Sequence, residues 1–218
     1  MDRLATLERD GRVWLRGACP AGELAVLAQE TSVEAKPGTR IDIGDRLMAV
    51  LRDGSVGRAI SSLGQGMAPV RVVAFDKSPD SNWGLPWHQD RVIRVAARDD
   101  SAPVTNWSLK AGAWHCEPAE AVLRRMLFVR VHIDGCDETN GAMELALGSH
   151  REGIVSAAKA EEVAGRCMTE IAESSPGDIL VMSMLLLHRS RPALSARSRR
   201  AVRVDYAAGP PPAPLGWA

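Results

Sequence analysis

The stretch NWGLPWHQDR, residues 82–91, combines two tryptophans with a histidine and an aspartate two positions apart. If His88 and Asp90 lie on a strand, their side chains point to the same side, because residues i and i+2 share a face. A neutral imidazole nitrogen and a carboxylate oxygen aimed at one point suit a divalent transition metal. The HxD triplet alone is a weak signal, since the same residues also occur as ordinary polar positions on strands.

A metal site of this kind needs a third ligand, and the chain has four other histidines: His115, His132, His150 and His188. His188 follows the apolar run LVMSMLLL, so it would lie at the mouth end of a strand buried inside a barrel. Two histidines and one carboxylate leave three coordination positions open, as non-haem Fe(II) oxygenases require. The alternative for His188 is a hydrogen-bonded histidine of the core.

Hydroxyl and basic side chains follow His188. Ser190 comes two residues later and Arg199 eleven later, at the start of RRAVRVDY. A hairpin of this length would place Arg199 opposite the inner part of the strand that carries His188. There its guanidinium could bind a carboxylate through two parallel hydrogen bonds, with Ser190 as a further donor. The alternative is that Arg199 and its arginine neighbours form a solvated basic edge.

Short runs rich in β-branched residues supply the elements that must position these side chains. Glycine, proline and asparagine separate the runs, which is typical of an all-β sandwich or barrel. Within MLFVRVHID the polar residues Arg130 and His132 share one face and aliphatic residues share the other. We expect strands at 70–75, 91–97, 126–134, 142–147, 178–188 and 200–208.

Helical signals are concentrated before the first of these strands. PAGELAVLAQE at 20–30 has apolar residues at helical spacing, and residues 39–64 carry a second helical pattern. Residues 154–166 indicate one helix or turn between strands. We therefore expect a single domain over residues 1–218, made of a helical part at 1–65, a β core at 66–208 and a proline-rich tail at 209–218.

Composition excludes several classes of partner. Of 218 residues, 45% are hydrophobic, and 27 Lys and Arg balance 27 Asp and Glu, so no net field attracts nucleic acid or an anionic membrane. No signal peptide or long apolar run is apparent, and the four widely spaced cysteines fit reduced thiols. We expect a cytoplasmic monomer or homodimer that acts on a small molecule.

Taken together, AFDKSPDSNWGLPWHQD, VRVHIDG, NGAMELALGSH, PGDILVMSMLLLHRSRP and RRAVRVDYA resemble the phytanoyl-CoA dioxygenase-like family of Fe(II)- and 2-oxoglutarate-dependent oxygenases. The motifs follow the family's order from about residue 70 to the C-terminus. The resemblance implies a double-stranded β-helix, the jelly-roll barrel that cupins also have.

The resemblance also implies roles for individual residues. His88, Asp90 and His188 would hold Fe(II), while Arg199 and Ser190 would bind the far carboxylate of 2-oxoglutarate. With O2 as the other co-substrate, 2-oxoglutarate would be decarboxylated to succinate and CO2 as a small molecule is oxidised. Related halogenases carry a small residue in place of the aspartate, so Asp90 favours hydroxylation of a C–H bond over halogenation.

Five further residues are candidates for the substrate pocket. Arg130 and His132 would bind a polar or acidic substrate, or 2-oxoglutarate, if their strand face points into the barrel, whereas inter-strand ion pairing is the alternative. Trp83 and Trp107 are candidates for pocket walls, although tryptophans commonly fill cores. His115 would line the mouth of the pocket or lie in a surface loop.

Two other classes of protein fit part of the pattern. A cupin-like isomerase or hydrolase would bind a metal without needing Arg199 or 2-oxoglutarate. A non-catalytic β-sandwich would bind a small ligand and use the HQD triplet as ordinary strand residues. Metal stoichiometry and succinate formation distinguish these three classes.

Overall fold

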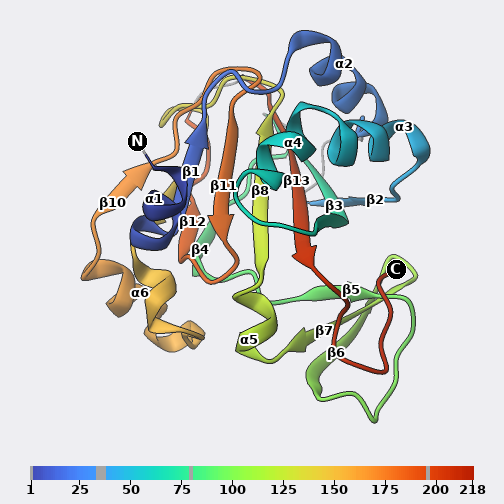
Figure 1. Cartoon of the computed structure of the whole chain (residues 1–218). Coiled ribbons are helices and arrows are strands. Elements are labelled where there is room, and N and C mark those ends of the chain that lie inside the picture. Colours follow the sequence, from blue (N-terminus) through green and yellow to red (C-terminus); the bar gives the residue numbers. More distant parts are fainter. Residues whose placement is uncertain (1, 33–37, 79–80, 195–196) are drawn as a thin grey trace.

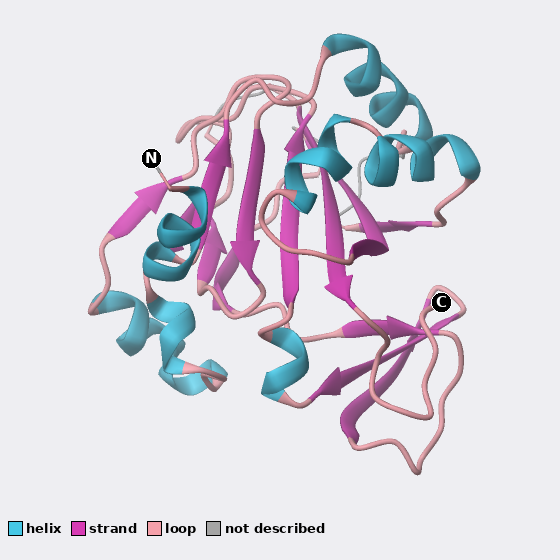
Figure 2. Ribbon diagram, in the orientation of Figure 1, coloured by secondary structure: helices cyan, strands magenta, loops and turns pink. Residues whose placement is uncertain are grey.

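The computed structural model describes all residues except 1, 33–37, 79–80 and 195–196, so part of the AFDKSPDSNW motif lies outside the described residues. Two antiparallel sheets stand at the centre, with helices on the outer side of the larger one and a small third sheet at one end (Figures 1 and 2). The expected mainly β fold with flanking helices is confirmed.

The largest sheet has six strands in the order β1-β11-β8-β13-β3-β2. Every neighbouring pair in it is antiparallel. The strands in that order are Arg12–Leu15, Ile179–Ser183, Met126–His132, Arg199–Ala208, Met67–Lys77 and Thr39–Ile41.

The other two sheets are smaller. The four-stranded sheet has the order β10-β9-β12-β4, with strands Thr169–Ile171, Met143–Ala146, His188–Ser190 and Leu85–His88. The three-stranded sheet has the order β5-β7-β6, with strands Ile93–Val95, Ala113–Pro118 and Val104–Lys110.

The helices are short, and those of the N-terminal region cover the six-stranded sheet (Figure 1). No helix among the described residues is long and apolar enough to cross a membrane. The helices are α1 (Arg3–Asp10), α2 (Ala21–Glu30), α3 (Asp45–Met48), the π-helical turn η1 (Ala49–Asp53), α4 (Ser55–Ser61), α5 (Glu120–Leu123), the 3-10 turn η2 (Ser149–Glu152) and α6 (Ala157–Gly165).

Strand β8 separates two hydrophobic cores, as its alternating sequence predicts. Val129 and Val131 pack with the helices on the outer face of the large sheet. Phe128, on the opposite face, packs with Met143 and Leu145 of the four-stranded sheet. The two sheets therefore face each other, and the inner side of β8 is where a cavity between them must lie.

The expected strand at 178–188 is wrong in one respect, because the structure divides it between the two sheets. Strand β11 ends at Ser183, and a turn over residues 184–187 leads into β12, which begins at His188. Ser183 holds this turn by accepting the backbone N–H of Leu186 at its carbonyl. The turn residues are all buried, so the apolar run continues through it and gives no local sign of a break.

The first 65 residues are not wholly helical, contrary to expectation. Residues Arg12–Leu15 form β1 at one edge of the large sheet by pairing with β11, and Thr39–Ile41 form β2 at the other edge. Both strands have only three or four residues, too few for a period-two pattern to stand out.

A buried hydrogen bond joins the helical layer to the large sheet, and its removal is expected to destabilise the protein modestly. The Tyr206 hydroxyl on β13 donates to the carbonyl of Leu51 at 2.6 Å. Tyr206→Phe keeps the ring but leaves that carbonyl without this donor, so the free energy of unfolding should fall by about 1–2 kcal/mol. Urea unfolding of the two proteins measures the difference, and equal midpoints would contradict the assignment.

Candidate active site

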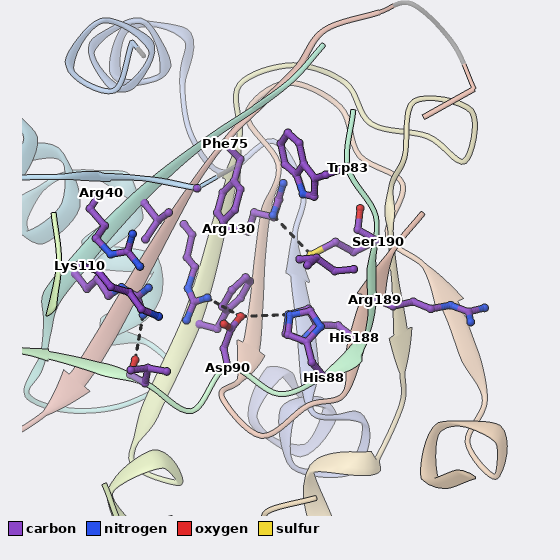
Figure 3. Close-up of a pocket in the computed structure, with 18 of the residues that line it drawn as sticks. Arg40, Phe75, Trp83, His88, Asp90, Lys110, Arg130, His188, Arg189 and Ser190 are labelled. Carbon is purple, nitrogen blue, oxygen red and sulfur yellow. Dashed lines mark hydrogen bonds and ion pairs between the residues drawn. The ribbon is translucent and has the colours of Figure 1, made fainter. Parts of the chain in front are cut away.

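Two neighbouring side chains, His88 and Asp90, come together with the sequence-distant His188 between the two sheets (Figure 3). One ligand atom from each of His88, Asp90 and His188 lies within 4.8 Å of the other two. The His188 Nε2 atom is 3.2 Å from Asp90 Oδ2, and the two imidazole centroids are 4.4 Å apart. This convergence is what a two-histidine, one-carboxylate metal centre requires.

Strand pairing brings the two histidines together. His88, the last residue of β4, is the register partner of His188, the first residue of β12. Asp90 lies just beyond the end of β4. The expectation that residues i and i+2 of one strand point to the same side therefore does not apply to His88 and Asp90, of which only His88 is on the strand. Between them, Gln89 anchors the chain: its amide group donates to the carbonyls of Gly153 and Leu185.

Hydrogen bonds fix both imidazoles in the orientation of metal ligands. The Nδ1 atom of His88 lies 2.8 Å from the Pro86 carbonyl, and that of His188 lies 2.9 Å from the Leu186 carbonyl. A carbonyl only accepts, so each Nδ1 carries the proton and each Nε2 presents a lone pair. Burial, followed by the nearby His188, also lowers the pKa of His88 and favours its neutral form.

Arg203 is the immediate partner of the carboxylate in this group. Its Nη1 lies 2.5 Å from Asp90 Oδ2, and its Nε donates to Asp205 at 2.7 Å. Burial by itself would raise the pKa of Asp90, but the charge of Arg203 outweighs it and holds that pKa well below its usual range. Asp90 is therefore anionic at neutral pH, and the chemistry of the three donors fits a divalent transition metal.

A second polar group lies farther along the same cavity, around Arg199. Arg199 is 2% exposed, and its Nη1 donates to the Gly141 carbonyl. Lys77, the register partner of Arg199 on β3, donates to Ser190 Oγ at 3.2 Å. Gly141 has φ +81°, and an added Cβ there would lie 2.9 Å from Lys77 Nζ, so a glycine suits this close approach.

This second group holds more buried donors than acceptors. Arg199 Nε has no hydrogen-bond partner among the described residues, and neither do Arg130 Nε and Nη2. The remaining donor of Arg130 meets only the sulfur of Met143, at 3.6 Å. Buried cationic donors without acceptors are costly in a protein alone, so they indicate a site for an anionic ligand.

One cavity of about 410 Å³ is lined by the His-Asp-His group and, in the second group, by Arg199, Arg130 and Ser190. Its charged lining is strongly one-sided: seven residues are arginine or lysine and one, Asp90, is an acid. The residues that line it are Gly38, Arg40, Arg71, Val73, Phe75, Trp83, Leu85, His88, Asp90, Val92, Lys110, His115, Phe128, Arg130, Met143, His188, Arg189, Ser190, Arg199 and Arg203.

Of the five residues suggested for a substrate pocket, Arg130, Trp83 and His115 line this cavity. His132 and Trp107 are not among its lining residues. His132 faces inward but is bound instead by the Ser174 hydroxyl at 2.8 Å and packs on Trp14 of β1. Trp107 lies in the three-stranded sheet, edge-on to Trp114.

The expected hairpin geometry for Arg199 is also corrected. Strand β13 pairs with β8 and β3, whereas β12 pairs with β4 and β9, so Arg199 and His188 belong to different sheets. They face each other across the cavity instead of along a shared ladder. Sequence reasoning missed Lys77, Arg40, Arg71 and Arg203, although the alternation in VRVVAFDK places Arg71 and Lys77 on one face.

Comparison with known proteins assigns the family. The family model for phytanoyl-CoA dioxygenase (PhyH) matches residues 7–201, so the chain belongs to this family of Fe(II)- and 2-oxoglutarate-dependent oxygenases. No curated protein sequence matches the chain.

Solved structures show the same fold at low identity, which bears out the expected jelly-roll barrel. AviO1 from Streptomyces viridochromogenes Tue57 is 18% identical with a TM-score of 0.63, and the match covers 96% of each chain. The non-heme alpha ketoglutarate dependent epimerase SnoN from nogalamycin biosynthesis is 14% identical with a TM-score of 0.64, covering 94% of this chain and 80% of SnoN. HygX from Streptomyces hygroscopicus, with nickel and 2-oxoglutarate bound, is 15% identical with a TM-score of 0.62, covering 94% and 85%.

Proposed function

We propose that this protein is a dioxygenase that uses Fe(II), 2-oxoglutarate and O2 to hydroxylate a C–H bond of a small molecule, with succinate and CO2 as the other products. The observation that carries the proposal is the cavity itself. It joins a His-Asp-His group to a buried arginine, Arg199, whose Nε has no partner among the described residues. A cupin-like metal enzyme would need only the first of these groups.

His88, Asp90 and His188 would hold Fe(II), and Arg199 would bind the far carboxylate of 2-oxoglutarate with the help of Ser190. When bound, the iron and its co-substrates supply an oxidant strong enough to replace C–H by C–OH. Support for these roles comes from family membership and from HygX, which binds nickel and 2-oxoglutarate in the same fold.

The chain's own contribution is orientation and the exclusion of water. Phe128 packs against the His188 ring at a centroid distance of 5.6 Å, and Phe75 and Trp83 line the cavity towards Arg130 (Figure 3). Aromatic walls keep the reacting centre from bulk water and so protect a reactive oxidant from side reactions. Asp90 supports hydroxylation over halogenation, because its carboxylate takes the position that a halide would need.

Labelled oxygen tests the reaction type. Iron-loaded protein is incubated with 2-oxoglutarate, 18O2 and a panel of small molecules with chloride present, and products are read by mass. We expect one 18O atom in the oxidised product for each succinate formed. Chlorinated product, or oxidised product without 18O at matching succinate yield, would contradict hydroxylation; SnoN shows that this fold also serves an epimerase.

We expect Lys77 to make the binding of 2-oxoglutarate depend on pH. Burial, followed by the neighbouring charges of Arg199 and Arg130, lowers the pKa of Lys77 to about 8. Above that pH the amine is neutral and attracts the 2-oxoglutarate dianion less, so the KM for 2-oxoglutarate should rise as pH passes about 8. Lys77→Met should have a higher KM at pH 7 and lack this rise, while Lys110→Met at the cavity edge should keep it.

The lowered pKa of Lys77 also predicts the pH dependence of stability without co-substrate. Between about pH 8 and 10.5, the ordinary pKa of a lysine, the unfolded chain holds a proton at Lys77 that the folded protein has lost. Stability should therefore rise with pH across this interval, and the rise should be smaller in Lys77→Met. A pH-independent KM in the wild type, together with equal stability profiles, would contradict the role of Lys77.

A further inference from the structure

Strand β3 lines the cavity with Arg71, Val73 and Phe75, and the same face continues to Lys77 beside Arg199. Arg71 and Lys77 lie six residues apart on that face, about 20 Å along an extended strand. Lys77 pairs in register with Arg199, whereas Arg71 pairs with Asp205. If Arg199 binds 2-oxoglutarate, the Arg71 end is left for another molecule.

A neutral histidine orients one arginine at this second end. Arg40 on β2 donates from Nε to His115 Nε2 at 3.3 Å. His115 Nδ1 lies 3.0 Å from the Ala113 carbonyl, so that nitrogen carries the proton and Nε2 accepts. Burial lowers the pKa of His115 to about 4, which keeps the ring neutral. The two terminal nitrogens of Arg40 have no hydrogen-bond partner among the described residues, and Figure 3 draws the side chain reaching into the pocket.

A second arginine at this end is only partly neutralised. Arg71 Nη1 donates to the Val92 carbonyl at 3.0 Å and lies 3.3 Å from Asp205 Oδ2. Its Nε is buried and has no partner among the described residues. Asp205 lies closer to Arg203 than to Arg71, and Arg203 also contacts Asp90. Two carboxylates, Asp90 and Asp205, therefore face the three guanidinium groups of Arg40, Arg71 and Arg203.

Bound co-substrate would not remove the surplus. The two charges of 2-oxoglutarate would be taken up by the metal and by the Arg199 end, where Arg130 and Lys77 also lie without a carboxylate partner among the described residues. Arg40 and Arg71 would still face the cavity with donors unused. An apolar substrate would desolvate these guanidinium groups without giving them an acceptor, and a neutral polar one would leave their charge uncompensated, both of which are less favourable than pairing with an anion.

We infer that the substrate carries an oxyanion head group, a carboxylate or a phosphoryl group, which Arg40 and Arg71 bind at the end of the cavity remote from Arg199. The C–H bond that reacts then lies between this head group and the His-Asp-His group. The inference rests on the proposed function and narrows it to small anionic substrates. Guanidinium groups suit both kinds of oxyanion, because their paired N–H donors match two oxygens at once.

Binding of simple anions to the loaded protein tests this inference. Protein saturated with Ni(II) and 2-oxoglutarate, which cannot turn over, is titrated calorimetrically at constant ionic strength with methylphosphonate and with acetate. Dimethyl methylphosphonate and acetamide are the neutral counterparts. The variants are Arg40→Gln, Arg71→Gln and the control Arg94→Gln, which removes a nearby arginine that is bound to Asp42 and does not line the cavity.

We expect the anions to bind and their neutral counterparts not to bind. Arg40→Gln and Arg71→Gln should each weaken anion binding by about tenfold or more, as expected for loss of a charge-assisted hydrogen bond. Arg94→Gln should leave it nearly unchanged, and 2-oxoglutarate affinity should be the same in all four proteins. The tighter of the two anions indicates the head group.

Three results would overturn the inference. The first is that the anions do not bind although Ni(II) and 2-oxoglutarate do. The second is that they bind Arg40→Gln as tightly as the wild type. The third is that they bind only when 2-oxoglutarate is absent, which would place them at the Arg199 end. Each of these leaves the proposed function standing. Failure to take up Ni(II) and 2-oxoglutarate at all would overturn the proposed function and this inference with it.

Discussion

Asp90→Asn is expected to weaken Fe(II) binding by at least about a hundredfold and to remove succinate formation. The change keeps the shape of the side chain and deletes its charge, so the metal would lose the one anionic ligand of the His-Asp-His group. Changes to residues that merely support ligands commonly cost ten- to a hundredfold in affinity, and loss of a ligand charge should cost more. Metal content after dialysis and succinate formation from 2-oxoglutarate measure both effects.

Asp90→Asn should still fold, so a loss of metal binding can be attributed to the missing carboxylate. Arg203, the cation that contacts Asp90, keeps its hydrogen bonds to Asp205. His150→Gln is a suitable control, because His150 is a buried histidine outside the cavity whose Nε2 contacts the Glu8 carbonyl. Metal binding that is intact in Asp90→Asn, or equally weak in His150→Gln, would contradict the assignment of the metal centre.

Arg199→Met is expected to raise the Kd for 2-oxoglutarate by at least about thirtyfold without destabilising the protein. Removing one partner of a buried charge pair costs about 2 kcal/mol or more, which corresponds to that factor. Before co-substrate binds, however, Arg199 is a buried cation beside Lys77 and Arg130 with no carboxylate partner in the described residues. Its replacement by an apolar side chain should keep the stability or add up to about 2 kcal/mol.

Arg200→Met, on the same strand, is the control that distinguishes loss of a 2-oxoglutarate contact from loss of a positive charge. Arg200 follows Arg199 but is exposed and paired with Asp134 at 2.9 Å. Arg200→Met should leave the Kd for 2-oxoglutarate unchanged and lower stability by roughly 1 kcal/mol or less, as surface ion pairs do. If Arg199→Met binds 2-oxoglutarate normally, or loses more stability than Arg200→Met, the buried arginine has a structural role instead.

The sequence predicts His88, Asp90 and His188 as candidates for one site, because the HxD triplet and a histidine after a buried apolar run can each be read from a few neighbouring residues. These local signals leave the role of His188 open, and the resemblance of the ordered motifs to the family is what groups it with His88 and Asp90. The alternation in MLFVRVHID likewise predicted the two faces of β8. The periodicity within one strand is enough to predict which of its residues share a face.

The anion site could not be predicted, because it depends on pairing between distant strands. Arg40 and His115 are 75 residues apart and come from different sheets, so neither predicts the other. His132 and Trp107 do not line the cavity for a related reason. The alternation of a strand predicts which side chains point into the barrel, but it does not predict which of them line the cavity. The His132 ring is hydrogen-bonded to Ser174 instead, and Trp107 belongs to the three-stranded sheet.

An anaerobic titration of the metal-free protein with Fe(II) and 2-oxoglutarate, followed by visible absorption, tests whether the His-Asp-His group and Arg199 hold iron and 2-oxoglutarate together. We expect a charge-transfer band that appears only with both ligands, is lost in His88→Ala and needs much more 2-oxoglutarate in Arg199→Met. Iron binding without such a band would contradict the oxygenase assignment and favour a metal-dependent, non-oxidative jelly roll. Absence of iron binding would leave the HQD triplet as ordinary polar residues at the end of β4.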